Sequence, residues 1–181
     1  MTTMVKIVNL NQETKKLVYE LFSKSENSPY VNINENLNQI FGENFSEPDG
    51  VPVVWMDDNV GSKSLEIEIC DNVEGSDIYE LILRSAWEVP TKYLVKLASC
   101  LNEINEDIAI LGTYEDETFE PMGAFVFAYN YQEIEEFEEI DTEQMNDDDD
   151  YRQEMLTELI DLRDSLWDSY LEVKKEREEG F

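Results

Sequence analysis

The side chains of this sequence that could do chemistry are mostly carboxylates. Of 181 residues, 43 are Asp or Glu and 13 are Lys or Arg, and there is no histidine, so the net charge is −30. A net charge of this size repels phosphate groups, which disfavours direct binding to nucleic acid or to an anionic membrane. We therefore expect partners that carry positive charge, either a basic protein surface or cations.

These carboxylates are concentrated in one part of the chain. Residues 114–162 hold 18 of the 43, with Arg152 as the one basic side chain among them. A solvated surface or an adaptation to salt would spread the charge more evenly. On a helix, residues three or four apart lie ~5–6 Å from each other, and duplex DNA carries one charge per ~1.7 Å of axis. A folded array of carboxylates can therefore imitate phosphates, and the predicted partner-binding residues are Glu133, Glu135, Glu136, Glu138, Glu139, Asp141, Glu143, Asp147, Asp148, Asp149 and Asp150.

Catalytic chemistry has few candidates in this sequence. Nucleophilic triads and Cys–His pairs need a general base, usually the histidine that is absent here. No glycine-rich phosphate-binding motif is present. Pairs of carboxylates can do acid–base work, but among 43 of them some pairs arise by chance. We predict no enzyme, no catalytic residue and no cofactor; a small-ligand enzyme would need a large pocket around Trp87 and Tyr114.

A metal site is not predicted either. Asp57, Asn59 and Glu68 stand at the first, third and twelfth positions of a calcium-loop register. However, Ser62 occupies the sixth position, where such a loop requires glycine, and Glu68 lies in a predicted strand. This segment is better explained as an acidic turn ahead of a strand.

Two pairs of residues are predicted to be structural. Cys70 and Cys100 each lie in an apolar stretch and are expected to be reduced core thiols. Trp55 and Trp87 could form a ligand platform, but we expect them to pack under a sheet as core aromatics.

The elements that must position these residues follow from hydrophobic periodicity and turn signals. Their order predicts an α+β fold, a ferredoxin-like antiparallel sheet with helices on one face. Strands are predicted at residues 4–8, 65–69, 78–87, 108–111 and 122–131, and helices at 14–24, 33–41 and 90–104.

The C-terminal part is predicted to add a long helix. We expect a domain over residues 1–131, an acidic connecting stretch over 132–150 and an amphipathic helix over 151–179. The apolar residues of this helix recur at alternating spacings of three and four, so the helix can fold back on its own domain or pair with its copy in a dimer. This seam consists of Met155, Leu159, Leu162, Leu166, Tyr170 and Val173.

Three segments together resemble a known family. They are Trp55-Met56-Asp57-Asp58-Asn59-Val60-Gly61-Ser62-Lys63, then Ser85-Ala86-Trp87-Glu88-Val89-Pro90, then Tyr114-Glu115 followed by Met122-Gly123. In this order and spacing they resemble the YubB-like ferredoxin-like domain of phage and plasmid proteins, over roughly residues 52–130. The resemblance implies a fold and an origin in a mobile element, and it implies no reaction and no active-site residue.

Together these features predict a non-catalytic binding protein of a phage or mobile element. It would occlude the basic nucleic-acid-binding surface of a bacterial host protein, as a DNA-mimic inhibitor of, for example, a defence system. The alternative is a structural or assembly module that dimerises or docks through its C-terminal helix. No run approaches the ~20 apolar residues of a membrane span and no leader is evident, so we expect the cytoplasm of a bacterial cell.

Overall fold

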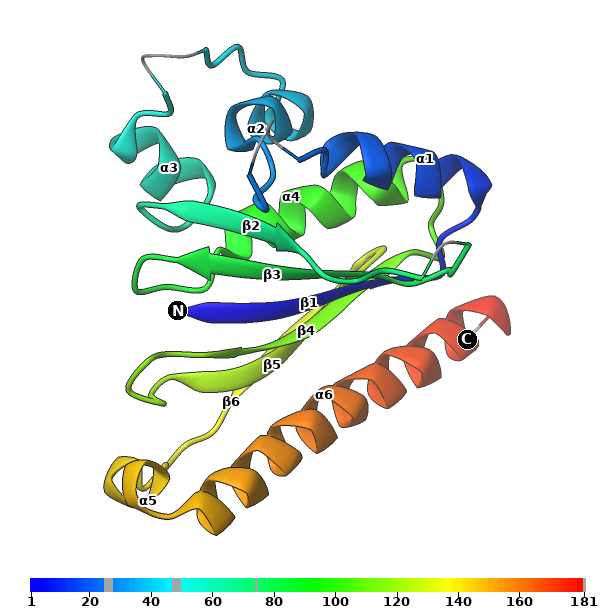
Figure 1. The fold of residues 1–181 in the computed structure, drawn as a ribbon. Coiled ribbons are helices and arrows are strands. Elements are labelled where there is room, and N and C mark those ends of the chain that lie inside the picture. Colours follow the sequence, from blue (N-terminus) through cyan, green and yellow to red (C-terminus); the bar gives the residue numbers. More distant parts are fainter. Residues whose placement is uncertain (25–27, 47–49, 74, 181) are drawn as a thin grey trace.

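The chain forms one antiparallel sheet with helices packed against both of its faces (Figure 1). The computed structural model describes residues 1–24, 28–46, 50–73 and 75–180. The elements are β1 (Thr2–Val8), α1 (Gln12–Leu21), α2 (Ile33–Phe41), α3 (Val53–Asn59), β2 (Leu65–Ile69), β3 (Tyr79–Ser85), α4 (Thr91–Asn102), β4 (Ala109–Glu115), β5 (Met122–Ala128), β6 (Tyr131–Glu136), α5 (Thr142–Asp147) and α6 (Asp149–Glu178).

The strand order explains where the first four helices lie. The sheet reads β2-β3-β1-β4-β5-β6, and every neighbouring pair is antiparallel. The connections from β1 to β2 and from β3 to β4 each cross over a strand and carry helices, and α1 to α4 lie on the same face (Figure 1). This confirms the predicted α+β class and the predicted antiparallel sheet with helices α1 to α4 on one face, to which the structure adds the strand β6, while α6 packs on the other face.

Alternation along the strands gives each face of the sheet a different cover. Val5, Ile7, Leu81 and Leu83 point toward α1–α4 and are almost fully buried in the main core. On the opposite face, α6 covers β4, β5 and β6 and leaves the β2-β3-β1 half without a helix (Figure 1). Cross-strand ion pairs lie on this uncovered half, between Lys6 and Glu80 at 2.9 Å and between Arg84 and Glu68 at 3.1 Å.

Helix α6 folds back on its own domain, which is the first of the two predicted fates. Leu166 and Tyr170 pack on a shallow apolar surface that includes Ala109, Ala124 and Ala128, whose small side chains let the helix approach the strands closely. Nearer its start, Met155 and Leu159 pack with Met122 and Met145 in a separate cluster. The seam residues Leu162 and Val173 are half-buried. A dimer through this seam would require α6 to leave its sheet.

The far end of α6 is fastened to the domain by polar contacts. Lys174 Nζ lies 2.6 Å from Asp107 Oδ1, and Arg177 donates hydrogen bonds to the carbonyl oxygens of Tyr129 and Asn130 at 3.0 and 2.8 Å. Because cations near a helix C-terminus also suit the helix dipole, this end is held in two ways.

The acidic connecting stretch predicted over residues 132–150 is instead built into the fold. Its first residues form β6, its middle forms α5, and α6 begins at Asp149. The acidic composition of residues 131–136 does not predict the strand β6. An edge strand, which is paired on one side only, tolerates glutamates, and these also discourage pairing with another chain. Asp141 then caps α5 by accepting a hydrogen bond from the Gln144 amide at 2.9 Å.

Three smaller expectations need correction. The short helix α3, over residues 53–59, is not among the predicted elements. Trp55 packs against Phe41 and Phe45, as expected of a core aromatic, but Trp87 is 76% exposed and does not pack under the sheet. Residues 22–24 were assigned to a helix, whereas α1 ends at Leu21.

Buried tyrosines make the fold sensitive to alkali. Burial raises the pKa of Tyr79 to about 12, and it raises the pKa values of Tyr93 and Tyr114 as well, the latter with help from Glu136. A folded-state pKa above the unfolded value of ~10 means that stability is present below pH ~10 and is lost as pH rises through the folded values. We expect the free energy of unfolding to fall above pH ~10 by about 1 kcal/mol per pH unit for Tyr93 alone. Denaturant titrations at increasing pH, followed by circular dichroism and tyrosinate absorbance, measure this loss; ionisation near pH ~10 with an intact fold would contradict it.

Candidate functional site

The negative charge of the chain is divided unequally between its two halves. Residues 97–181 carry 27 acidic and five basic side chains, a net charge of −22, whereas residues 1–96 carry 16 and eight, a net charge of −8. The first part forms β4, β5, β6, α5 and α6, and the second forms the β2-β3-β1 half of the sheet and most of the helices on its other face. The charge asymmetry therefore has a direction in space and points toward the α6 side of the molecule.

The predicted partner-binding residues lie on ordered elements that adjoin one another. They follow β6, the turn into α5, α5 itself and the start of α6, and all of them are exposed except Glu133, which is half-buried. Several also hold the structure together. Glu136 accepts a hydrogen bond from the Tyr114 hydroxyl at 2.9 Å, Glu133 accepts one from Tyr131, and Asp148 caps α6.

A longer array of carboxylates runs along the outer face of α6. Its members recur every three or four residues, opposite the buried positions Met155, Leu159, Leu166 and Tyr170, and every one is exposed. At ~1.5 Å per residue the array is about 39 Å long, with one carboxylate per ~5.6 Å. We call it the acidic ridge: Asp150, Glu154, Glu158, Asp161, Asp164, Asp168, Glu172 and Glu176.

The acidic ridge is electrostatically unfavourable in the free protein. Two unit charges ~5.6 Å apart in water repel by about 0.7 kcal/mol, slightly more than RT. Like charges at helical spacing therefore oppose helix formation, by ~0.2–0.5 kcal/mol per pair in isolated helices. A helix selected for stability alone would alternate acidic and basic residues on this face. Counterions must gather along the ridge, and a basic surface that replaced them would release them.

The basic residues of α6 do not neutralise most of the ridge. Arg152 is turned toward α5, where it donates to the Met145 carbonyl at 2.8 Å, and Lys174 and Arg177 are used in fastening the helix end. Within the described residues the one ridge carboxylate in an ion pair is Asp164, whose partner Arg163 lies 2.7 Å away. Three of the five cations of α6 thus contact the domain, whereas Arg163 pairs with the ridge and the exposed Lys175 lies 3.9 Å from Glu179.

The prediction placed the contact surface on residues 133–150 and missed the part of the acidic ridge beyond Asp150. The signal was present in the three- and four-residue recurrence of Asp and Glu from 150 to 176. Acidic and apolar periodicities that run in parallel define the two opposite faces of one helix.

Salt should stabilise this protein, since screening weakens repulsion along the ridge. Raising NaCl from ~0.01 to ~1 M shortens the Debye length from ~30 to ~3 Å. We expect the free energy of unfolding to rise by about 2 kcal/mol over this range. Urea titrations at each salt concentration measure it, and a variant with part of the ridge reversed to lysine should gain less. Stability that fell with salt would show that attractive ion pairs dominate.

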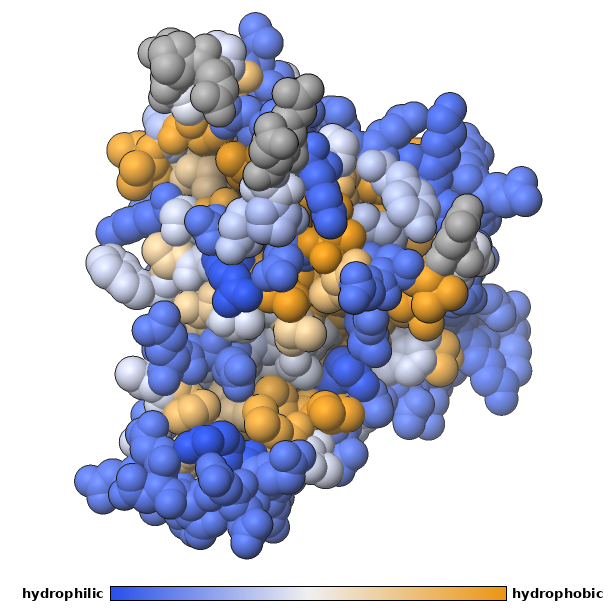
Figure 2. All heavy atoms as spheres, viewed as in Figure 1, coloured by the Kyte–Doolittle hydropathy of each residue, from blue (hydrophilic) through white to orange (hydrophobic). Residues whose placement is uncertain are grey.

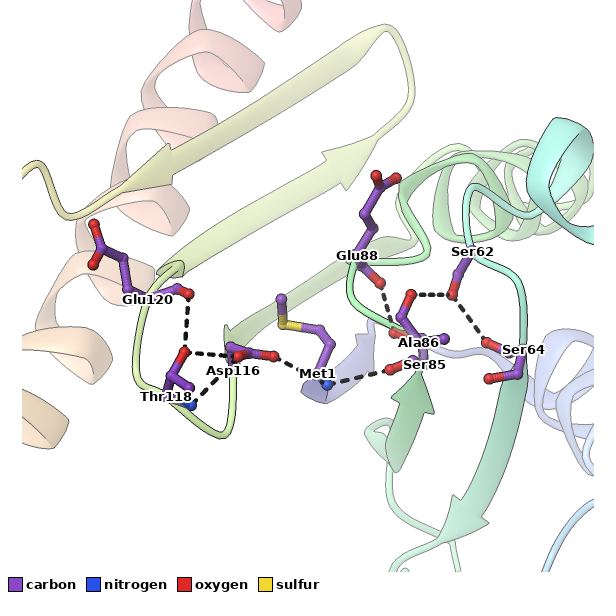
Figure 3. A network of polar contacts seen from close by, with 9 residues as sticks. All are labelled: Met1, Ser62, Ser64, Ser85, Ala86, Glu88, Asp116, Thr118 and Glu120. Carbon is purple, nitrogen blue, oxygen red and sulfur yellow. Dashed lines mark hydrogen bonds and ion pairs between the residues drawn. The ribbon is translucent and has the colours of Figure 1, made fainter. Parts of the chain in front are cut away.

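A second group of notable residues lies at the end of the sheet where β1 begins (Figure 3). The α-amino group of Met1 donates to the Ser85 carbonyl at 3.2 Å and pairs with Asp116 at 3.5 Å. Ser85 Oγ in turn donates to the Glu88 carbonyl at 2.7 Å, and Ser62 Oγ lies 3.0 Å from the Ala86 carbonyl. Burial raises the pKa of Asp116, but hydrogen bonds from Thr118 and the positive charge of the α-amino group outweigh it and lower the pKa overall.

These contacts fix the turn that displays Trp87. Its φ of 67° is in the left-handed region, which is strained for a bulky side chain, and Lys63 Nζ lies 5.1 Å from the ring centroid. A cavity of about 240 Å³ lies between Trp87, Tyr114 and Ile134. Drug-sized ligand sites usually occupy ~300–1,000 Å³, so this cavity is smaller than a typical one.

The remaining candidate motifs lie on separate elements. Asp57 and Asn59 lie in α3 and Glu68 lies in β2, and within residues 1–24, 28–46, 50–73 and 75–180 no three His, Cys, Asp or Glu side chains are grouped as metal ligands. Cys70 and Cys100 are free thiols, and burial raises the pKa of each.

Comparisons with known proteins do not assign this chain to a family. No protein family model, curated protein or solved structure matches this chain. The resemblance to the YubB-like domain therefore stays a prediction. Among the described helices, none is both long and apolar enough to cross a membrane.

Proposed function

We propose that this chain is a non-catalytic inhibitor that occludes a basic nucleic-acid-binding surface of another protein. The acidic ridge is the observation that carries the proposal. It is a line of exposed carboxylates about 39 Å long on a helix that is packed along its length against the sheet. The predicted contact residues of α5 adjoin its first turns, and Glu133 and Glu135 of β6 lie on the sheet face that α6 covers, whereas Glu136 lies on the opposite face.

The spacing of the ridge supports imitation of a single nucleic-acid strand. One DNA strand has a phosphate per ~3.4 Å of axis, so the ridge alone supplies about 60% of that linear charge density. A basic groove that binds phosphates would meet fixed carboxylates instead and would release the counterions of both partners. Steering by the net charge of −30 should also make association fast and strongly dependent on salt.

The wider setting of the proposal follows from the family resemblance. A phage or plasmid protein of this kind would act inside a bacterial cell, against a host protein such as a defence nuclease or a transcription component. Nothing in the proposal requires a reaction, because covering the groove is sufficient to exclude nucleic acid.

Affinity capture tests the proposal directly. The intact chain is immobilised, incubated with nuclease-treated bacterial lysate at low salt, and eluted first with duplex DNA and then with high salt. We expect the DNA eluate to contain basic nucleic-acid-binding proteins identified by mass spectrometry. A parallel column carries a variant with Glu154, Asp161 and Asp168 replaced by lysine, and it should lose these proteins.

Two outcomes would remove the proposal. One is recovery of neutral or acidic proteins alone, and the other is recovery of the same basic proteins by the reversed variant. A follow-up with the purified candidate asks whether the intact chain displaces labelled duplex DNA from it with one-to-one stoichiometry.

A further inference from the structure

An apolar groove lies between α6 and the half of the sheet that no helix covers. Its volume is about 310 Å³, enough for one bulky side chain, and it is lined by Met4 of β1, Thr113 of β4, and Leu156 and Ile160 of α6. Met4 is 47% exposed and Ile160 is 48% exposed, although both lie on elements with ample core positions for apolar residues. Figure 2 shows apolar side chains gathered at the surface between the sheet and the hydrophilic start of α6.

The flank of α6 that lines the groove carries further apolar side chains. Leu156, Ile160, Trp167 and Leu171 share that flank, and each of them is half-buried or exposed. This flank is adjacent to the acidic ridge around the helix, so a molecule lying on the ridge would also reach the groove. At one end of the groove stands Glu115, whose pKa is raised by burial and which has no ion-pair partner among the described residues.

The surrounding charge identifies what can occupy the groove. A second copy of this chain would bring together two molecules of net charge −30, which disfavours a homodimer on this face. Exposed apolar surface rimmed by one sign of charge is typical of protein interfaces, where a buried apolar anchor is surrounded by polar contacts. The complementary occupant is a basic protein segment with an apolar side chain among its lysines and arginines.

We propose that the groove bounded by Met4, Leu156 and Ile160 receives a large apolar side chain of the same basic partner whose cations contact the acidic ridge. This inference rests on the proposed function and adds its source of specificity. Charge alone would let the chain bind any polycation, including abundant basic proteins of the cell. An anchor in a fixed position beside the ridge selects a partner that has both features at the right distance.

Methyl NMR with defined peptides tests the anchor. The probe is a short helical peptide rich in Lys and Arg that carries one tryptophan, and its control is the same peptide with that tryptophan replaced by serine. We expect the tryptophan peptide to bind roughly tenfold more tightly, or better, because a large apolar side chain leaves water. Ring currents should shift the methyl signals of Met4 and Ile160 and should leave that of Val54 on α3 unchanged.

Variants separate the groove from the ridge. The exposed positions of Met4 and Ile160 allow M4S and I160S to be combined without loss of the fold, and this pair should abolish the difference between the two peptides. V54S, a matched change at a side chain that is 74% exposed on another helix, should preserve it. Equal affinities of the two peptides for the unmodified chain, or unshifted Met4 and Ile160 methyl signals, would overturn the proposal that the groove receives an apolar side chain.

The ridge variant with lysine at positions 154, 161 and 168 distinguishes the two proposals. It should weaken both peptides by the same factor and leave their ratio unchanged. If it left both affinities unchanged while the tryptophan peptide still shifted Met4 and Ile160, the groove would stand and the proposed function would fail.

Discussion

Replacing Glu154, Asp161 and Asp168 by lysine should abolish binding to basic partners while making the fold more stable. The three positions are seven residues apart and lie on one line of the acidic ridge. Their replacement changes the repulsive row into one of alternating sign, in which six neighbouring pairs from Asp150 to Glu172 become attractive. At ~0.2–0.5 kcal/mol per pair in each direction, we expect the free energy of unfolding to rise by about 2 kcal/mol or more.

The same substitutions should weaken binding by a factor on the order of a thousand at low salt, since each one removes an attraction and introduces a repulsion worth ~1 kcal/mol or more. Fluorescence anisotropy with the captured partner gives the affinity, and urea titration gives the stability. We expect the affinity to fall while the free energy of unfolding rises. An ordinary damaging mutation would lower both the affinity and the stability. A fold made less stable by the lysines would show that the ridge is not repulsive.

A matched variant controls for net charge. Glu43, Asp71 and Glu88 are exposed acidic residues outside α6 and the strands, and their replacement by lysine changes the net charge by the same amount. This control should reduce binding severalfold through weaker long-range steering and should leave most of the affinity. If it removed as much affinity as the ridge variant, the net charge and not the ridge would determine binding.

Leu166→Asp should unfold most of the α6 interface, at a cost of about 4 kcal/mol or more. Leu166 is 3% exposed and packs with Tyr170 on the alanine-rich surface of β4 and β5. The substitution removes this apolar contact and buries a carboxylate without a partner cation, and each of these is costly alone. Chemical denaturation measures the loss, and hydrogen exchange should show that the amides of α6 lose protection before those of β1 and β4.

The same substitution five residues along the helix is the control. Leu171 is 41% exposed on the flank of α6, so Leu171→Asp should change the free energy of unfolding by less than about 1 kcal/mol. Similar large losses from both variants would mean that α6 is held by its whole circumference, for example in an oligomer. An unchanged fold in Leu166→Asp would mean that the helix does not rest on the sheet.

Much of the fold could be predicted because local pattern and tertiary environment agree. The strict alternation of residues 65–69 and the apolar spacing of residues 94–101 each identify a half-buried element, and both elements are found. The strand β6 could not be found in this way, because its partner β5 supplies the hydrogen bonds and its glutamates reflect an open edge. Edge position is a property of the assembled sheet and is absent from the local sequence.

The candidate site was predicted in its composition and only partly in its geometry. Clustering of Asp and Glu predicts an anionic surface, and the residues chosen for it lie on β6, α5 and the start of α6, with Glu136 on the sheet face opposite α6. Whether α6 paired with a copy or with its own sheet depended on the small residues Ala109, Ala124 and Ala128, which belong to strands distant in sequence. Trp87 was expected in the core because tryptophan usually is, and a strained turn exposes it instead.

The attachment of α6 at both of its ends has a consequence for recognition. Arg152 attaches the start of this 30-residue helix to α5, and Lys174 and Arg177 attach its end to the domain. The helix is therefore a rigid element about 45 Å long. The spacing of the carboxylates along the helix is therefore fixed and cannot adjust to a partner. A polycation whose charges have a different spacing would pair with only some of these carboxylates, so the rigidity of α6 adds to the selectivity that the groove supplies.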